Sequence, residues 1–325
     1  MTDSEGLIFS LSTILHDLPS SIEILPGGIE EWTSSDPDGN KLPFLLSEGH
    51  LGIPQKILYK LYLRATVMFT AARKAQDHNA LIAFSITILL ANSAHQTALN
   101  TRKRLIISGK LDPKNELALI GTIISGNREC SKQSVIWAHR RWIFEYLYPP
   151  NPPSCFHAQL PCALVRDELQ ILARGCESYP RNYHAWTHRS YCMQSMMDLV
   201  TTSSDPAAEA IMQEEYLNLL RWVDLHVSDY SAMHYLFLLV QRFNMLQSGA
   251  PGLQSMNLVS LFGHTMSLLS SYPKHEALWM FIRSIIASAA LGDRSAMITH
   301  VQSSSQGDGV YGHKLLTFIQ SLPTD

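Results

Sequence analysis

The sequence predicts an all-α fold, a solenoid of about five helical hairpin repeats preceded by an N-terminal arm and a long helix. Three observations support this prediction. From Pro54 onward apolar residues recur at helical spacing, no segment alternates between polar and apolar residues as a strand would, and one segment recurs along the chain. Helices joined by short connections must pack on one another, as a bundle or as a solenoid. The internal repeat favours the solenoid.

Composition limits the functions that the chain can have. Its 325 residues suffice for one large domain or two smaller ones, and with 46% hydrophobic residues much apolar surface must be buried against other elements or a partner. Lys and Arg total 25 against 28 Asp and Glu, which argues against a general nucleic-acid binder. The five cysteines contain no Cys-x-x-Cys pair, so neither a disulfide framework nor a zinc finger is predicted.

The expected location is cytoplasmic. The acidic N-terminus is followed by no long apolar run, which is unlike a secretory signal, and the cysteine pattern fits a reducing compartment. The apolar run from Leu81 to Ala91 is far shorter than the roughly 20 residues that a membrane span needs. It predicts a fully buried helix instead.

The first 54 residues contain dense turn signals, at residues 26–28 and 34–40, which predict an arm with one short helix near Ile8 to Leu18. A long amphipathic helix is expected next, from Pro54 to about Lys74. Its helical spacing is shown by Ile57, Leu58, Leu61, Tyr62 and Ala65. We therefore expect an arm and leading helix over residues 1–77, packed on a repeat domain over residues 78–325.

Residues 179–190 are the reference for the repeat and read Tyr-Pro-Arg-Asn-Tyr-His-Ala-Trp-Thr-His-Arg-Ser. Four other segments align with them on one anchor position, which is apolar in every copy. The five anchors are Leu99, Trp137, Trp186, Met233 and Trp279, separated by 38, 49, 47 and 46 residues. This period fits two helices and two turns in each repeat. Helix breaks are expected near residues 77–79, 111–113, 149–153, 201–206, 248–252 and 272–273.

Each repeat combines a helix start with an anchor. Asn182, and Asp229 in the fourth copy, lie where an N-cap is needed to accept hydrogen bonds from backbone N–H groups. Four residues later the anchor is expected to pack against the preceding helix. Arginines that can reach carboxylates or helix C-terminal carbonyls of a neighbour follow three residues after an anchor, and they are Arg102, Arg140 and Arg189.

The segments Trp-Ala-His-Arg-Arg-Trp at 137–142 and Asn-Tyr-His-Ala-Trp-Thr-His-Arg at 182–189 resemble the repeats of protein prenyltransferase α subunits. Residues 21–26, 43–54 and 60–63 resemble a divergent branch of that family. The resemblance implies a right-handed α-α superhelix that wraps a β subunit, an α/α barrel with the catalytic zinc and the isoprenoid pocket. It also implies a type III-like protein geranylgeranyltransferase, formed with the β subunit of Rab geranylgeranyltransferase and inactive without it.

The resemblance further implies the substrates and the site residues. Geranylgeranyl diphosphate would be the co-substrate, a C-terminal cysteine of a protein the acceptor, and no cofactor would be bound by this chain. Arg181 lies where family members have a lysine that approaches the diphosphate, and Tyr183 matches a tyrosine beside peptide and isoprenoid, so both are candidate catalytic residues. The candidate substrate- or partner-binding residues are His184, His139, Arg141, His234 and Tyr235.

The fourth repeat departs from the pattern, with Met233 at the tryptophan position and Leu236 at the arginine position, and the first has Leu99 at its anchor. These departures keep open an alternative function, a non-catalytic helical scaffold that binds protein partners. The chain shows no catalytic triad order, phosphate loop, dinucleotide fingerprint or zinc protease motif, so no active site is expected on this chain alone.

One spacing fits a metal site. His184, His188 and Cys192 are four residues apart and lie on one helical stripe. Histidines beside the anchor tryptophan are ordinary packing residues in the repeats that the chain resembles, and no further ligand is spaced to complete a tetrahedral set. We therefore predict that this chain holds no metal ion.

Overall fold

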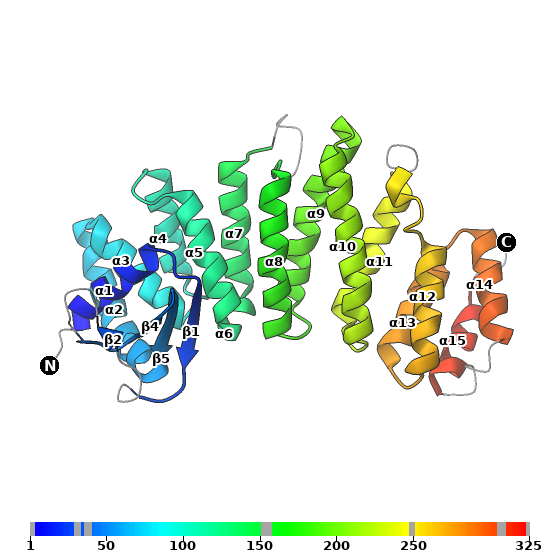
Figure 1. Cartoon of the computed structure of the whole chain (residues 1–325), viewed down its shortest axis with the longest axis horizontal. Coiled ribbons are helices and arrows are strands. Elements are labelled where there is room, and N and C mark those ends of the chain that lie inside the picture. Colours follow the sequence, from blue (N-terminus) through cyan, green and yellow to red (C-terminus); the bar gives the residue numbers. More distant parts are fainter. Residues whose placement is uncertain are drawn as a thin grey trace. The chain divides into compact units, whose positions relative to one another are not determined.

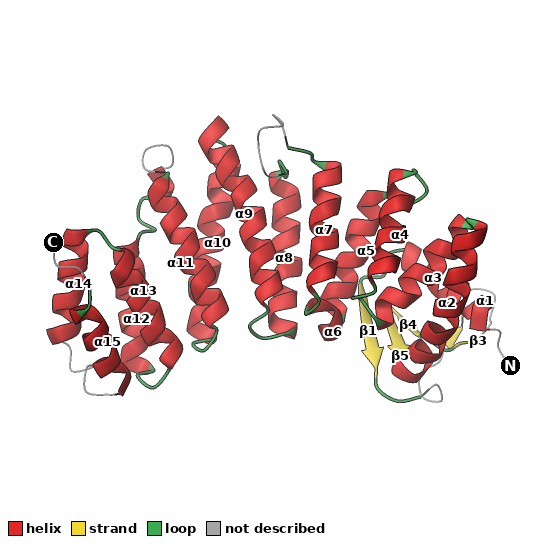
Figure 2. Cartoon of the chain, turned by 180° about the vertical axis from the view of Figure 1, so that it is seen from behind, coloured by secondary structure: helices red, strands yellow, loops and turns green. Residues whose placement is uncertain are grey.

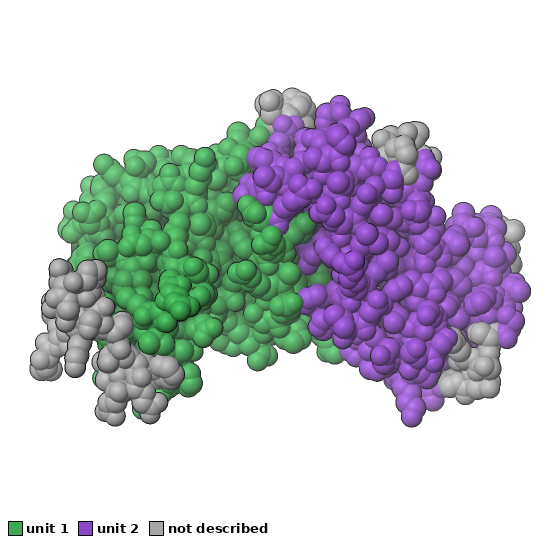
Figure 3. Space-filling model, in the orientation of Figure 1, with its two compact units in different colours: residues 1–158, 167–188 green, residues 159–166, 189–325 purple. Residues whose placement is uncertain are grey.

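The computed structural model describes residues 4–28, 34–35, 41–150, 158–246, 251–303 and 310–322. These ranges contain fifteen α-helices, one short 3-10 helix and five short strands, which confirms the predicted all-α helical repeat fold. The chain divides into two compact units (Figure 3), one of residues 1–158 and 167–188, the other of residues 159–166 and 189–325. The predicted division at residue 77 stays a prediction. None of the helices in the described ranges has the length and apolar character to cross a membrane.

The N-terminal helices agree with the sequence. Helix α1, Ser4–His16, is the short helix expected in the arm, and α2, Gln55–Ala75, is the long amphipathic helix. Helix α2 buries the apolar face that the periodicity predicted, including Ile57, Leu58 and Leu61. It ends at Gln76, whose left-handed backbone (φ 55°) lets its N–H bond to a carbonyl of the last turn.

A small sheet in the arm was not predicted, and the expectation that no strand is present is wrong. Strands β1 (Ser21–Leu25) and β5 (His50–Pro54) pair in parallel, and β4 (Leu45–Ser47) pairs antiparallel with β5. A second pair is formed by β2 (Ser34–Ser35) and β3 (Lys41–Leu42). Figure 2 shows the strands gathered beside helices of the first unit.

The strands were missed because the central strand β5 has no alternating pattern. Residues 51–54 are all buried, so both faces of this strand pack against other elements. The sheet also lies directly on α5. A Cβ added at Gly126 would come within 1.7 Å of the Ile22 carbonyl oxygen, so only glycine fits where this helix meets β1.

The remaining helices form the repeats (Figure 1). In order they are α3 His78–Ala91, α4 Gln96–Ile107, α5 Pro113–Gly126, α6 Arg128–Ser131, α7 Ser134–Leu147, α8 Cys162–Ser178, α9 Tyr183–Ser203, α10 Pro206–Leu225, α11 Tyr230–Met245, α12 Leu258–Ser271, α13 Glu276–Ser288, α14 Leu291–Ser303 and α15 Val310–Gln320. The 3-10 helix covers Pro251–Leu253. Helix α3 is buried over nearly its whole length, as its apolar sequence predicted.

The helix ends follow the predicted turn signals. The breaks expected near residues 77–79, 111–113, 201–206 and 272–273 each fall at or beside a helix end. Those at 149–153 and 248–252 lie partly outside the described residues. Asn182 caps α9, because its Oδ1 accepts the Ala185 N–H at 3.2 Å, and Asp229 caps α11 in the same way.

The anchors lie in the second helix of each hairpin, and all five are buried. Two of the tryptophans also fix the turn before their own helix. Trp137 Nε1 donates to the Ser131 carbonyl at 2.7 Å, and Trp279 Nε1 donates to the Pro273 carbonyl at 2.7 Å, in each case six residues back. Asn182 Nδ2 donates to the same Ser131 carbonyl at 2.9 Å. The anchor position thus joins apolar packing to the geometry of the connecting turn.

Candidate functional site

Three buried glutamates in the repeats each bind an arginine and one further polar side chain. We name the groups after their carboxylates. The Glu116 cluster contains Arg102 and His139, the Glu168 cluster contains Arg140 and His188, and the Glu215 cluster contains Arg189 and Tyr235. The first two lie in the first unit and the third lies in the second unit.

In the Glu116 cluster, Arg102 donates to both carboxylate oxygens, from Nε at 2.8 Å and from Nη2 at 2.5 Å. His139 Nε2 lies 2.9 Å from Glu116 Oε1. The remaining guanidinium nitrogen of Arg102 donates to the Ile82 carbonyl and to Ser85 Oγ. Each charged group is therefore hydrogen-bonded, as a buried ion pair requires.

The Glu168 cluster repeats this arrangement. Arg140 donates to both oxygens of Glu168, with Nε at 2.9 Å from Oε1, and its Nη1 donates to the Leu117 carbonyl at 2.6 Å. His188 Nε2 lies 2.9 Å from Glu168 Oε1. An ionised carboxylate can only accept, so the histidine carries its proton on Nε2 and donates it to Glu168.

The Glu215 cluster replaces histidine by tyrosine. Arg189 donates to Glu215 from Nε at 2.5 Å and from Nη2 at 2.8 Å, and the Tyr235 hydroxyl donates at 2.8 Å. Burial, followed by the nearby Glu215 carboxylate, raises the pKa of Tyr235 well above its usual value. The phenol therefore stays protonated and remains a hydrogen-bond donor.

The start of α9 is different, because its side chains reach the surface. Arg181 and Tyr183 are exposed, Tyr183 to 66%, and they flank the buried N-cap Asn182. Arg181 has a left-handed backbone with φ 60°, which is uncommon for a residue with a Cβ and is found most often at functional positions. Burial, and then the nearby Arg141 guanidinium, lower the pKa of the adjacent, half-buried His184, whose ring lies 5.6 Å from that of Tyr183.

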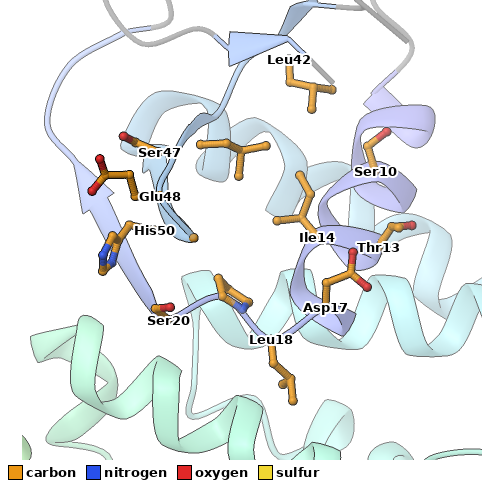
Figure 4. A pocket seen from close by; sticks show the side chains of 13 residues that line it. Ser10, Thr13, Ile14, Asp17, Leu18, Ser20, Leu42, Ser47, Glu48 and His50 are labelled. Carbon is orange, nitrogen blue, oxygen red and sulfur yellow. The ribbon is translucent and has the colours of Figure 1, made fainter. Parts of the chain in front are cut away.

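A hollow of about 660 Å³ lies in the arm, between α1 and the turn that joins β4 to β5. Figure 4 shows Ser10, Thr13 and Asp17 of α1 on one side of it. Ser47, Glu48 and His50 lie on the other side. None of the site residues that the sequence predicted lines this hollow.

Residues 165–196, which include most of α8 and the first part of α9, match the sequence profile described as "Protein prenyltransferase alpha subunit repeat". The chain carries a protein prenyltransferase alpha subunit repeat. The matched range contains the Glu168 and His188 side chains of one buried cluster and the exposed start of α9. The resemblance predicted from the repeated segments is confirmed.

Two relatives are named Protein prenyltransferase alpha subunit repeat-containing protein 1. The Homo sapiens protein is 28% identical over 289 residues, which is 76% of this chain and 69% of the relative. The Danio rerio protein is 26% identical over 284 residues, 76% of this chain and 64% of the relative. The chain therefore spans about two thirds of the length of these relatives. The Geranylgeranyl transferase type-2 subunit alpha of Saccharomyces cerevisiae is 23% identical over 151 residues, 46% of this chain and 40% of that protein.

The clusters have a fixed place in the prenyltransferase alpha subunit repeat. Each arginine follows an anchor by three residues, each histidine or tyrosine follows the next anchor by two, and each glutamate precedes that next anchor by 21 or 18 residues. Sequence reasoning found the arginines and missed the glutamates. The signal was a glutamate between a polar and an apolar residue at this distance before an anchor, at positions 116, 168 and 215.

The fourth repeat lacks the whole set. Leu236 stands three residues after the anchor Met233, Leu261 stands 18 residues before Trp279, and Phe281 stands two residues after it. All three are buried. The charged group is thus replaced by apolar residues at every position together, which avoids leaving an unpaired charge inside the fold.

Two predicted partner-binding residues need correction. His139 and Tyr235 are buried on Glu116 and Glu215, so their side chains offer no surface to a partner. His234 is exposed on α11, in the second unit. His188 is buried on Glu168 rather than exposed to an ion, and no group of three or more His, Cys, Asp or Glu side chains that could hold a metal ion is found in the described ranges.

We expect the clusters to make the protein sensitive to acid. Burial alone would raise the pKa of Glu116 and Glu168, but Arg102 with His139, and Arg140 with His188, outweigh it and lower each pKa to about 2. Since the folded pKa lies below the unfolded value, this stabilisation is present above about pH 5 and is lost as the pH falls toward 2. Urea unfolding measured from pH 7 to pH 3 should show a steep fall in the free energy of unfolding.

His188 contributes in the same direction. Burial lowers the pKa of its imidazole, so the folded state favours the neutral ring and protonation below about pH 6.5 opposes folding. A stability curve that stays flat from pH 7 to pH 3 would contradict this account of the clusters.

Proposed function

We propose that this chain is the α-type subunit of a heterodimeric protein prenyltransferase that transfers a geranylgeranyl group. The observation that carries the proposal is the start of α9 within the matched repeat, where Arg181, Tyr183 and His184 reach the surface together. Relatedness to a geranylgeranyl transferase α subunit supports a β subunit as partner. We assign the partner to the Rab geranylgeranyltransferase β type, which would give a type III-like enzyme.

In the proposed reaction, the thiolate of a C-terminal protein cysteine attacks C1 of geranylgeranyl diphosphate. The S–C1 bond forms while the C1–O bond breaks, diphosphate leaves with the bonding electrons, and the thiol proton passes to solvent. Zinc on the β subunit stabilises the thiolate when it is bound there. This chain contributes positive charge from Arg181 and Arg141, which stabilises the departing diphosphate through charge-assisted hydrogen bonds. The neutral His184 ring can donate one further hydrogen bond.

Reconstitution tests the proposal. The purified chain should be inactive alone, should elute as a complex with a Rab-type β subunit on gel filtration, and should then transfer geranylgeranyl to a substrate protein. Arg181→Asn removes the guanidinium and suits the left-handed backbone, because asparagine tolerates it better than most residues. We expect the variant pair to assemble normally with turnover reduced at least about tenfold.

Arg181→Lys is the matched control, because it keeps a positive charge and loses only the planar guanidinium. It should retain most of the turnover. Equal turnover of wild type and Arg181→Asn in an intact complex would remove Arg181 from the site. Failure of wild type to form any complex would overturn the proposed function itself.

A second candidate function is a non-catalytic scaffold. It is favoured by the fourth repeat, in which Leu236, Leu261 and Phe281 stand at the positions of the polar set. The printed names of the repeat-containing relatives also state no activity. A stable complex with the β subunit that transfers no isoprenoid to any tested acceptor would favour the scaffold.

A further inference from the structure

Helix α2 carries an unusual concentration of positive charge. Its 21 residues include Lys56, Lys60, Arg64, Arg73 and Lys74 and no Asp or Glu, in a protein whose net charge is -3. The cations of the last turn suit the negative end of the helix dipole, but Lys56 and Lys60 lie near the positive end, where cations are unfavourable. Helix stability therefore does not account for them.

The same exposed face carries an apolar stripe. Tyr59, Leu63 and Val67 are exposed to 60%, 48% and 66%, and their spacing of four residues places them in one line along the helix. Lys56 and Lys60 each precede a member of the stripe by three residues, so cations and apolar side chains lie next to one another. The nearest described acid is Glu5, whose carboxylate lies 3.7 Å from the Arg64 guanidinium.

A basic hollow lies at the C-terminal end of this face. It has a volume of about 520 Å³ and lies between the end of α2, the start of α3 and helix α4, all in the first unit. Its polar lining includes Arg73, Lys74, His78, Thr101 and Arg104, and no carboxylate side chain lines it. Guanidinium, ammonium and hydroxyl donors without a competing acid suit a phosphate group.

The hollow and the stripe belong to one surface. Thr70, which lines the hollow, follows Val67 by three residues on the exposed face of α2. We propose that this face docks on an anionic membrane, with Tyr59, Leu63 and Val67 entering the interface and the hollow receiving the phosphate of a lipid headgroup. A nucleic acid would use the cations alone and leave the stripe in water, whereas a bilayer surface accepts both. This inference goes beyond the proposed function and does not depend on the β subunit.

Sedimentation of the full chain with lipid vesicles tests the docking. The chain should bind phosphatidylcholine vesicles that contain phosphatidylserine, and it should bind neutral phosphatidylcholine vesicles at least about tenfold more weakly. Lys56→Glu with Lys60→Glu should weaken binding to the anionic vesicles by a similar factor. The matched control is Arg221→Glu with Lys274→Glu, which makes the same change in net charge at exposed positions in the second unit and should bind like wild type.

The apolar stripe and the hollow have their own variants. Leu63→Asn with Val67→Asn should reduce vesicle binding several-fold, while Leu217→Asn with Leu225→Asn, exposed leucines on α10, should not. Arg73→Gln with Arg104→Gln should abolish any preference for phosphatidylinositol phosphate over phosphatidylserine vesicles of equal charge. Circular dichroism of every variant checks that it remains folded.

Three results would overturn the proposal. The first is equal binding to neutral and anionic vesicles, or no binding to either. The second is wild-type binding by the stripe variant, because the apolar side chains would then not enter an interface. The third is binding to a single-stranded oligonucleotide that exceeds vesicle binding and is lost only in the charge-reversal variant, which would assign the surface to nucleic acid.

Discussion

Replacing Glu168 by leucine is expected to lower the free energy of unfolding by about 3 to 5 kcal/mol. The carboxylate is buried and accepts from Arg140 and His188, so its loss leaves a buried guanidinium with only the Leu117 carbonyl among its printed partners in the cluster. An unpaired charge inside the fold costs far more than an exposed one. Urea unfolding followed by circular dichroism at pH 7 measures the change.

The fourth repeat supplies the control for this experiment. Its leucine, leucine and phenylalanine stand where the Glu168 cluster has arginine, glutamate and histidine. The triple variant Arg140→Leu, Glu168→Leu and His188→Phe copies that apolar set, so it should recover most of the stability lost by Glu168→Leu alone. A triple variant no more stable than the single one would show that packing, and not an uncompensated charge, causes the loss.

Trp186→Ala should be the second large effect, with a loss of about 3 to 5 kcal/mol. The indole is buried at the anchor position of the third repeat, and alanine would leave a cavity that the neighbouring helices cannot fill completely. The free energy of unfolding should fall, and amide hydrogen exchange should become faster over residues 167–188.

Trp142→Ala is the matched control for the anchor. This tryptophan lies in the same unit, is only partly buried, and stacks on Tyr146 with ring centroids 5.4 Å apart. Truncation there removes less buried surface and should cost clearly less than Trp186→Ala. Equal losses at both positions would mean that the anchor has no special weight in the repeat.

Local sequence signals predicted most of the helical architecture. Asn182 and Asp229 are short polar residues directly before helical periods, and both cap their helices. The anchors recur at a nearly constant spacing, and all are buried. Helix start, helix face and repeat length depend on residues within a few turns of one another, so a pattern in the chain is enough to find them.

Contacts between distant residues were not predictable in this way. Glu116, Glu168 and Glu215 lie 14, 28 and 26 residues from the arginines that bind them, and a glutamate on an amphipathic helix has the same local pattern whether it faces solvent or an arginine. The burial of His139 and Tyr235 follows from those same carboxylates, so it was missed with them. Strand β5 escaped because both of its faces are covered.

The sequence by itself determined the repeat, the helices and their caps, and the family resemblance, because each of these is encoded over short stretches of chain. Only the tertiary structure decided which polar side chains are buried together and which remain at the surface. It separated Arg189 and His188, bound inside the fold, from Arg181 and Tyr183 a few residues earlier, which reach the surface at the start of the same helix. The reason is that burial depends on the neighbouring helix, whose residues are far away in the chain.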